Sequence, residues 1–141
     1  MERKEFLSLL GLGTASVFVA TCLGACSKAS SGYSPVTPPT SVDFNVDLSL
    51  PGSAPLNTNG GYIYANGIII AKTTAGAYIA VSQACTHQGV TVQYLGSNQV
   101  FYCPSHGATF TDTGAVVSGP TSYPLTQYKT SLSGSVLRIY S

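Results

Sequence analysis

Short runs of apolar and β-branched residues, separated by turn signals, dominate the chain from Val42 to its C-terminus. No segment in this part shows the apolar spacing of an amphipathic helix. The pattern instead predicts strands over residues 44–50, 61–65, 68–73, 78–82, 90–95, 99–102, 108–111 and 136–140. We therefore expect an all-β domain built of small antiparallel sheets.

Two turn signals connect predicted strands. Asn66-Gly67 lies between two apolar runs and is typical of a two-residue hairpin turn. Asp112-Thr113-Gly114 lies between two further apolar residues and predicts a second hairpin turn. The same triplet resembles that of aspartic proteases, but only one copy is present, and those enzymes need a pair of carboxylates. We therefore assign no catalytic residue to it.

The first 26 residues follow a different pattern. Arg3 and Lys4 precede an uncharged apolar run over residues 6–25, which is typical of an export signal. The run ends in Leu23-Gly24-Ala25-Cys26, which resembles the bacterial lipobox, whose cysteine receives a lipid. We expect a helical signal segment over residues 1–26, lipidation of Cys26, and a lipoprotein anchored in the cell-envelope membrane that faces the periplasm or the extracellular side. The alternative is an uncleaved helix, because about 20 apolar residues can span a bilayer.

The remaining chain divides into a linker and one domain. Residues 27–41 are rich in Ser and Pro and lack apolar periodicity, as expected of a tether. Residues 42–141 carry three acidic and three basic side chains, so no basic stripe is available to bind nucleic acid. With so little charge, a redox partner is expected to be recognised by short-range contacts of apolar and Tyr side chains.

Two short motifs contain both histidines of the chain: C-x-H at residues 85–87 and C-x-x-H at residues 103–106. If Cys22 leaves with the signal and Cys26 receives lipid, the motif cysteines are the two that remain. In an exported domain such a pair could form a disulfide. Each motif, however, supplies one thiolate and one imidazole, as a [2Fe-2S] centre with two Cys on one iron and two His on the other requires. Zinc is a competing reading, although structural zinc sites usually pair Cys with Cys and His with His.

At these motifs the chain resembles the Rieske iron–sulfur family, from about residue 81 to residue 124. The resemblance implies one [2Fe-2S] cluster per chain, with Cys85 and Cys103 on the inner iron and His87 and His106 on the outer iron. It also implies that the proline-rich segment 119–124 covers the cluster. The residues expected around the ligands are Gly89, Pro104, Gly107, Ala108, Phe110, Gly119 and Pro120.

The chain departs from the branch of this family found in respiratory and photosynthetic cytochrome complexes. Val90 and Ser105 stand where that branch has two cysteines that form a disulfide between the ligand loops. Ala108 and Phe110 stand where it has a Ser and a Tyr that donate hydrogen bonds to the sulfurs. Because such donors stabilise the reduced cluster, their absence predicts a potential near the bottom of the range of roughly −150 to +300 mV. The chain is in this respect closer to the ferredoxin-like branch that feeds oxygenases.

These features predict a membrane-tethered one-electron carrier. Its partner would be a redox protein such as a cytochrome, a reductase or the large subunit of an oxidoreductase. The alternatives are a small Rieske subunit of a larger oxidoreductase and a non-redox zinc-binding or structural module. An oxygenase needs an iron site with two His and a carboxylate, and no His remains for one once the cluster has its ligands.

Overall fold

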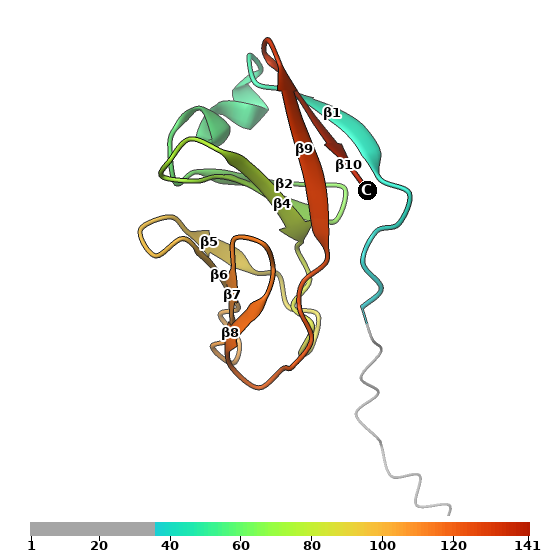
Figure 1. The fold of residues 1–141 in the computed structure, drawn as a ribbon, viewed down its shortest axis with the longest axis vertical. Helices are drawn as coiled ribbons and strands as arrows, with labels where there is room; N and C mark the ends of the chain where they lie inside the picture. Colours follow the sequence, from blue (N-terminus) through green and yellow to red (C-terminus); the bar gives the residue numbers. More distant parts are fainter. Residues whose placement is uncertain (1–35) are drawn as a thin grey trace, which may run out of the picture. The chain divides into compact units, whose positions relative to one another are not determined.

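The computed structural model describes residues 36–141, so the predicted signal segment, Cys26 and residues 27–35 of the predicted tether lie outside the described residues. Two antiparallel sheets make up the described part (Figure 1). The larger sheet has six strands in the order β1-β10-β9-β4-β3-β2, and the smaller has four in the order β5-β6-β7-β8. The prediction of an all-β domain is confirmed. Within residues 36–141, no helix is long and apolar enough to cross a membrane.

The elements follow one another along the chain with one short 3-10 helix, η1, after the first strand. Their bounds are β1 Asp43–Asp47, η1 Pro51–Asn57, β2 Tyr62–Ala65, β3 Ile68–Lys72, β4 Tyr78–Ser82, β5 Gln93–Leu95, β6 Val100–Tyr102, β7 Thr109–Thr111, β8 Val116–Ser118, β9 Gln127–Ser133 and β10 Val136–Tyr140.

Eight of these strands fall where the apolar pattern predicts them, and β4 and β10 have the predicted bounds. The pattern did not predict β9, because its residues are mostly polar and exposed and only Tyr128 is buried. It also did not predict β8, a three-residue strand without a buried residue, or η1. Hydrogen bonding and burial stabilise η1, since the Ser53 hydroxyl lies within hydrogen-bond distance of the carbonyl oxygens of Asp47 and Leu50, and Leu56 is buried.

The larger sheet curls until its two edge strands approach each other. One open groove is lined by residues of β1, η1 and β2, although β1 and β2 lie at opposite ends of the strand order. The sheet is therefore a partly closed barrel with η1 beside the opening. Its interior is filled by Val42, Leu48, Leu56, Ile68, Ile70, Ala80, Tyr128, Leu137 and Ile139.

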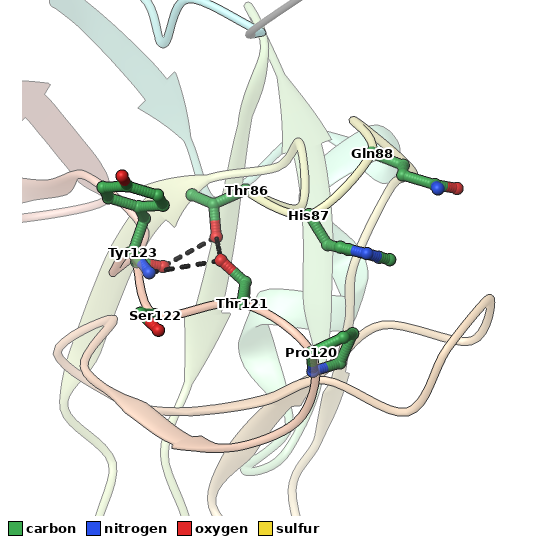
Figure 2. Close-up of a pocket in the computed structure, with 7 residues that line it drawn as sticks. All are labelled: Thr86, His87, Gln88, Pro120, Thr121, Ser122 and Tyr123. Carbon is green, nitrogen blue, oxygen red and sulfur yellow. Dashed lines mark hydrogen bonds between the residues drawn. The ribbon is translucent and has the colours of Figure 1, made fainter. Parts of the chain in front are cut away.

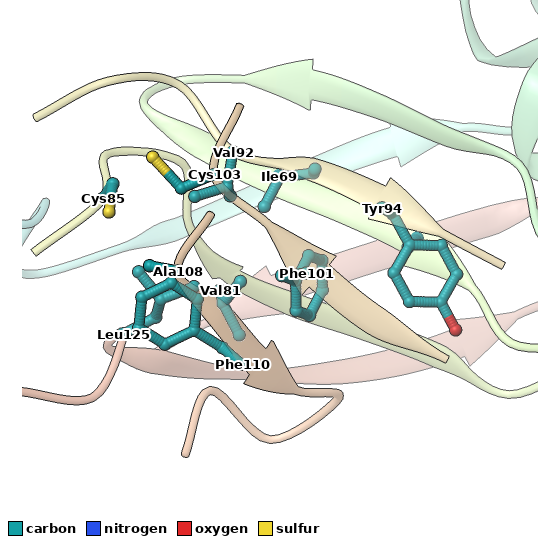
Figure 3. Packing of buried hydrophobic residues seen from close by; sticks show 11 residues of the cluster. Ile69, Val81, Cys85, Val92, Tyr94, Phe101, Cys103, Ala108, Phe110 and Leu125 are labelled. Atoms are coloured by element: carbon teal, nitrogen blue, oxygen red, sulfur yellow. The ribbon is translucent and has the colours of Figure 1, made fainter. Parts of the chain in front are cut away.

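Strand β3 is buried on both faces. Ile68 and Ile70 point into the barrel, whereas Ile69 and Ala71 belong to a second core that includes residues of the smaller sheet. Because side chains alternate across a strand, a strand between two cores is apolar at nearly every position. The second core contains Ile69, Ala71, Val81, Cys85, Val92, Tyr94, Phe101, Cys103, Ala108, Phe110 and Leu125 (Figure 3).

Both predicted hairpin turns are present. Asn66 and Gly67 have φ values of 51° and 79°, as a two-residue turn with two left-handed residues requires, and Ala65 pairs with Ile68 across it. In the second turn the N–H of Thr111 donates to the carbonyl of Ala115 at 2.8 Å.

The two-core arrangement predicts different effects for neighbouring substitutions on β3. Ile68→Ala and Ile69→Ala each remove a fully buried side chain and should each lower the free energy of unfolding by about 2–5 kcal/mol in urea titrations. Only Ile69→Ala should also speed loss of a bound cluster, measured by visible absorbance, because Ile69 shares its core with Cys85 and Cys103. Equal effects of both variants on cluster loss would contradict this assignment.

Candidate metal centre

The first predicted ligand loop joins β4 to β5. A β-bridge between Ala84 and Thr91 closes its base. Inside the loop, the N–H of Cys85 donates to the carbonyl of Val90 at 2.8 Å, and the N–H of Gly89 donates to the carbonyl of Cys85 at 2.7 Å. Gly89 has φ +74°, a left-handed conformation that glycine adopts without steric cost. These bonds turn the chain tightly around His87.

The second predicted ligand loop joins β6 to β7 and repeats this backbone pattern. The N–H of Cys103 donates to the carbonyl of Ala108 at 2.8 Å, and the N–H of Gly107 donates to the carbonyl of Cys103 at 3.0 Å. Gly107 also has φ +74°. The two loops therefore have the same hydrogen-bonded frame, although the histidine follows its cysteine by two residues in one and three in the other.

The two cysteines lie at one end of the second core. Figure 3 shows both sulfurs at this end, away from Tyr94. Both thiols are free, and both residues are almost fully buried. Burial raises the pKa of the Cys85 thiol, and the neighbouring Cys103 acts in the same direction, whereas the backbone N–H groups of His87 and Gln88 oppose the rise. A metal could bind these thiols as thiolates, and the two N–H groups are directed at one of them.

The two histidines lie together on the side that opens to solvent. Their ring centroids are 4.8 Å apart and the rings are nearly perpendicular, at 88°. His106 is exposed, while Nδ1 of His87 is buried and has no hydrogen-bond partner among residues 36–141. A buried nitrogen without a partner is costly, and a metal would satisfy it.

The four side chains therefore form a cysteine pair and a histidine pair. Within residues 36–141, no group of three or more His, Cys, Asp or Glu side chains is arranged to hold a metal ion. A Rieske cluster takes two protein ligands on each of two irons, Cys on one and His on the other, so this donor set fits it.

A polar latch joins the first ligand loop to the proline-rich segment (Figure 2). The Thr86 hydroxyl donates to the carbonyl of Tyr123 at 2.6 Å and lies 3.1 Å from the hydroxyl of Thr121. The N–H of Tyr123 donates to that Thr121 hydroxyl at 3.2 Å. Sequence reasoning did not single out either threonine, although Thr121 lies in the segment 119–124 that was expected to cover the cluster. The signal that could have placed Thr86 at the site was its position between the predicted ligands Cys85 and His87.

The other end of the proline-rich segment contacts the second ligand loop. Gly119, with φ +120°, lies so close that an added Cβ would be 2.5 Å from the Cα of Ala108. Ala108 and Phe110 are buried beside the cysteines in the second core, and neither carries a hydroxyl group. Val90 is the residue of the first loop that departs from the cytochrome-complex branch, and its apolar side chain packs against the same core.

An open, uncharged pocket of about 380 Å³ adjoins His87. Figure 2 shows Pro120 beside the His87 ring, and the remaining lining comes from Thr86, Gln88, Thr121, Ser122 and Tyr123. Tyr123 is 73% exposed, and Pro104 in the second loop is also exposed. The histidine side of the site is thus accessible to another molecule.

The chain is similar to known proteins both in sequence and in fold. The sequence model of the Rieske [2Fe-2S] domain matches residues 48–129, more than half of the chain. The cytochrome b6-f complex iron-sulfur subunit of Chlorobaculum thiosulfatiphilum is 31% identical over 141 residues, which cover 98% of this chain and 75% of that protein. The plasma membrane Rieske protein of Synechocystis PCC 6803 has 30% identity and a TM-score of 0.56, over 70% of this chain and 99% of that one. A ferredoxin of Sphingomonas yanoikuyae B1 shares the fold at 20% identity and a TM-score of 0.50, over 60% of this chain and 88% of that one.

Proposed function

The chain belongs to the Rieske [2Fe-2S] family, and from this premise we propose that it is a membrane-tethered, low-potential electron carrier with Cys85, His87, Cys103 and His106 as cluster ligands. It is a Rieske iron–sulfur electron carrier related to the iron–sulfur subunits of cytochrome b6f complexes. The [2Fe-2S] cluster of this family stores and releases one electron.

The proposed ligand set rests on one observation above all. Two loops with the same hydrogen-bonded frame each contribute one residue to a buried cysteine pair and one to a histidine pair. Because both cysteines are almost fully buried, their end of the site is shielded from water. The exposed His106 and the pocket beside His87 leave the opposite end open to a redox partner.

The low potential is supported by the side chains around the cysteines. Ala108 and Phe110 are almost fully buried in the core that holds both sulfurs, and neither side chain can donate a hydrogen bond. Donors to sulfur stabilise the reduced cluster, so their absence favours the oxidised one. This local environment differs from the one expected of the cytochrome-complex branch, to which the b6-f relatives belong by name.

The membrane tether and the partner are supported by the sequence and by the names of relatives. The lipobox-like residues before Cys26 support a lipid anchor, and one similar structure is described as a plasma membrane Rieske protein. A cytochrome, a reductase or the large subunit of an oxidoreductase could meet the uncharged pocket beside His87 through apolar and Tyr contacts. Relatives named as subunits of a cytochrome complex favour, as a second candidate, a small subunit of a larger oxidoreductase.

Electron paramagnetic resonance tests the ligand set directly. The protein should be silent when oxidised and give a rhombic Rieske signal after dithionite reduction. His106→Ala should lose this signal, whereas Gln88→Ala, next to His87 but outside the proposed ligand set, should retain it. A zinc-loaded sample, or one still without a signal after cluster reconstitution, would contradict the proposal.

A redox titration tests the low potential. The wild-type midpoint should lie in the lower part of the range of roughly −150 to +300 mV. Ala108→Ser combined with Phe110→Tyr should raise it, because both added hydroxyls could donate to sulfur. Phe44→Tyr is the matched control, since Phe44 packs against the barrel core and its variant should leave the midpoint unchanged. A wild-type midpoint potential near the top of the range would refute the proposed low potential.

The lipid anchor is tested in cells by labelling with a radioactive fatty acid. Wild-type protein should incorporate the label and fractionate with membranes, and Cys26→Ser should lose the label. Cys22→Ser is the control, because this residue lies within the apolar run before the lipobox-like residues. Equal labelling of wild type and Cys26→Ser would exclude Cys26 as the modified residue.

A further inference from the structure

The last part of the predicted tether lies against the domain. Residues 36–39, here called the strap, lead toward β1 and run beside the barrel (Figure 1). At its first residue, Val36 packs on the backbone of Gly89, since an added Cβ on Gly89 would lie 2.4 Å from a Val36 methyl carbon. Val36 is nevertheless 45% exposed, so it covers the outer side of the first ligand loop.

The other end of the strap is attached to the barrel. The hydroxyl of Tyr128, which is buried in the barrel core, donates to the carbonyl of Pro39 at 2.8 Å. The Pro39 ring also lies against Gly67, whose added Cβ would come within 2.9 Å of it. Tyr128 lies on β9 and Gly67 lies in the turn between β2 and β3, so two separate parts of the barrel position Pro39.

Between these two attachments the strap crosses from the barrel to the ligand loop. It forms one wall of a cavity of about 220 Å³, and the opposite wall includes Ser82, Gln83, Ala84 and Thr86. The sequence of the strap suits this role, because Pro38 and Pro39 have fixed φ angles and lose little conformational entropy when they dock.

We propose that the strap is a positioning element for the cluster, which clamps the first ligand loop from outside while Val90 attaches it to the core from inside. This inference rests on the proposed ligand set. Among residues 36–141, the second ligand loop has the same frame but no such cover, since an added Cβ on Gly107 would meet none of their atoms within 4 Å. The two loops should therefore respond differently when the strap is removed.

Hydrogen exchange of the full-length, cluster-loaded protein tests the strap. The strap variant carries Val36→Gly, Thr37→Ser, Pro38→Gly and Pro39→Ser. Mass spectrometry should show exchange about five- to tenfold faster in a peptide over residues 86–92, because a half-buried valine and its attachment are lost. A peptide over residues 104–110 is the internal control and should exchange at the wild-type rate. Cluster loss to an iron chelator should accelerate by a similar factor.

Val36→Ala is the milder variant and should speed exchange in residues 86–92 to a smaller extent, whereas Val117→Ala, at an exposed valine on β8, should have no effect. Unchanged exchange in both strap variants would overturn the inference, and so would equal acceleration of both loops, which indicates a general loss of stability. These failures differ from a failure of the proposed function, in which wild-type protein would lack the Rieske signal.

Discussion

The structure depends on the burial of two cysteines at the end of an apolar core that the two sheets share. Cys85 and Cys103 come from different loops, and both lie in the same core as Ile69 of the larger sheet and Phe101 of the smaller one. Thiols in such a place are protected from water, whereas His106 in the second loop is exposed and His87 in the first loop lines an open pocket. Each loop combines a buried cysteine with a more exposed histidine because its chain turns back toward the core after the histidine. The turn is completed at a glycine with positive φ, whose N–H donates to the carbonyl of the cysteine four residues earlier.

Three kinds of contact support the loops in place of a disulfide between them. Val90 packs inward against the shared core, and the Thr86–Thr121–Tyr123 latch joins the first loop to the proline-rich segment. That segment in turn contacts the second loop where Gly119 meets Ala108. The loops are thus linked through a third segment by hydrogen bonds and close packing. Hydrogen bonds and packing contacts are each weaker than a covalent bond. The proposed strap at Gly89 would therefore add support to the first loop.

The proposed low potential would distinguish this chain from the cytochrome b6-f subunits to which it is similar in sequence. The relatives that are similar over most of this chain include subunits of cytochrome b6-f complexes. The potential depends on a few hydrogen bonds to the sulfurs, so it can change without any change of fold. Under the proposed low potential, Ala108 and Phe110 are such positions, because both are buried in the core and neither side chain carries a hydroxyl group.

The sequence by itself determined those features that depend on residues close together in the chain. The bounds of β4 and β10, the Asn66-Gly67 turn and the spacing of the two motifs follow from residues close together in the chain. Only the tertiary structure decided β9, the latch and the strap. Strand β9 is polar and forms because β4 and β10 offer backbone partners on both sides. The latch and the strap join residues 35 and 53 positions apart, as Thr86 to Thr121 and Val36 to Gly89, and no pattern within one segment can encode a contact whose other half lies elsewhere in the fold.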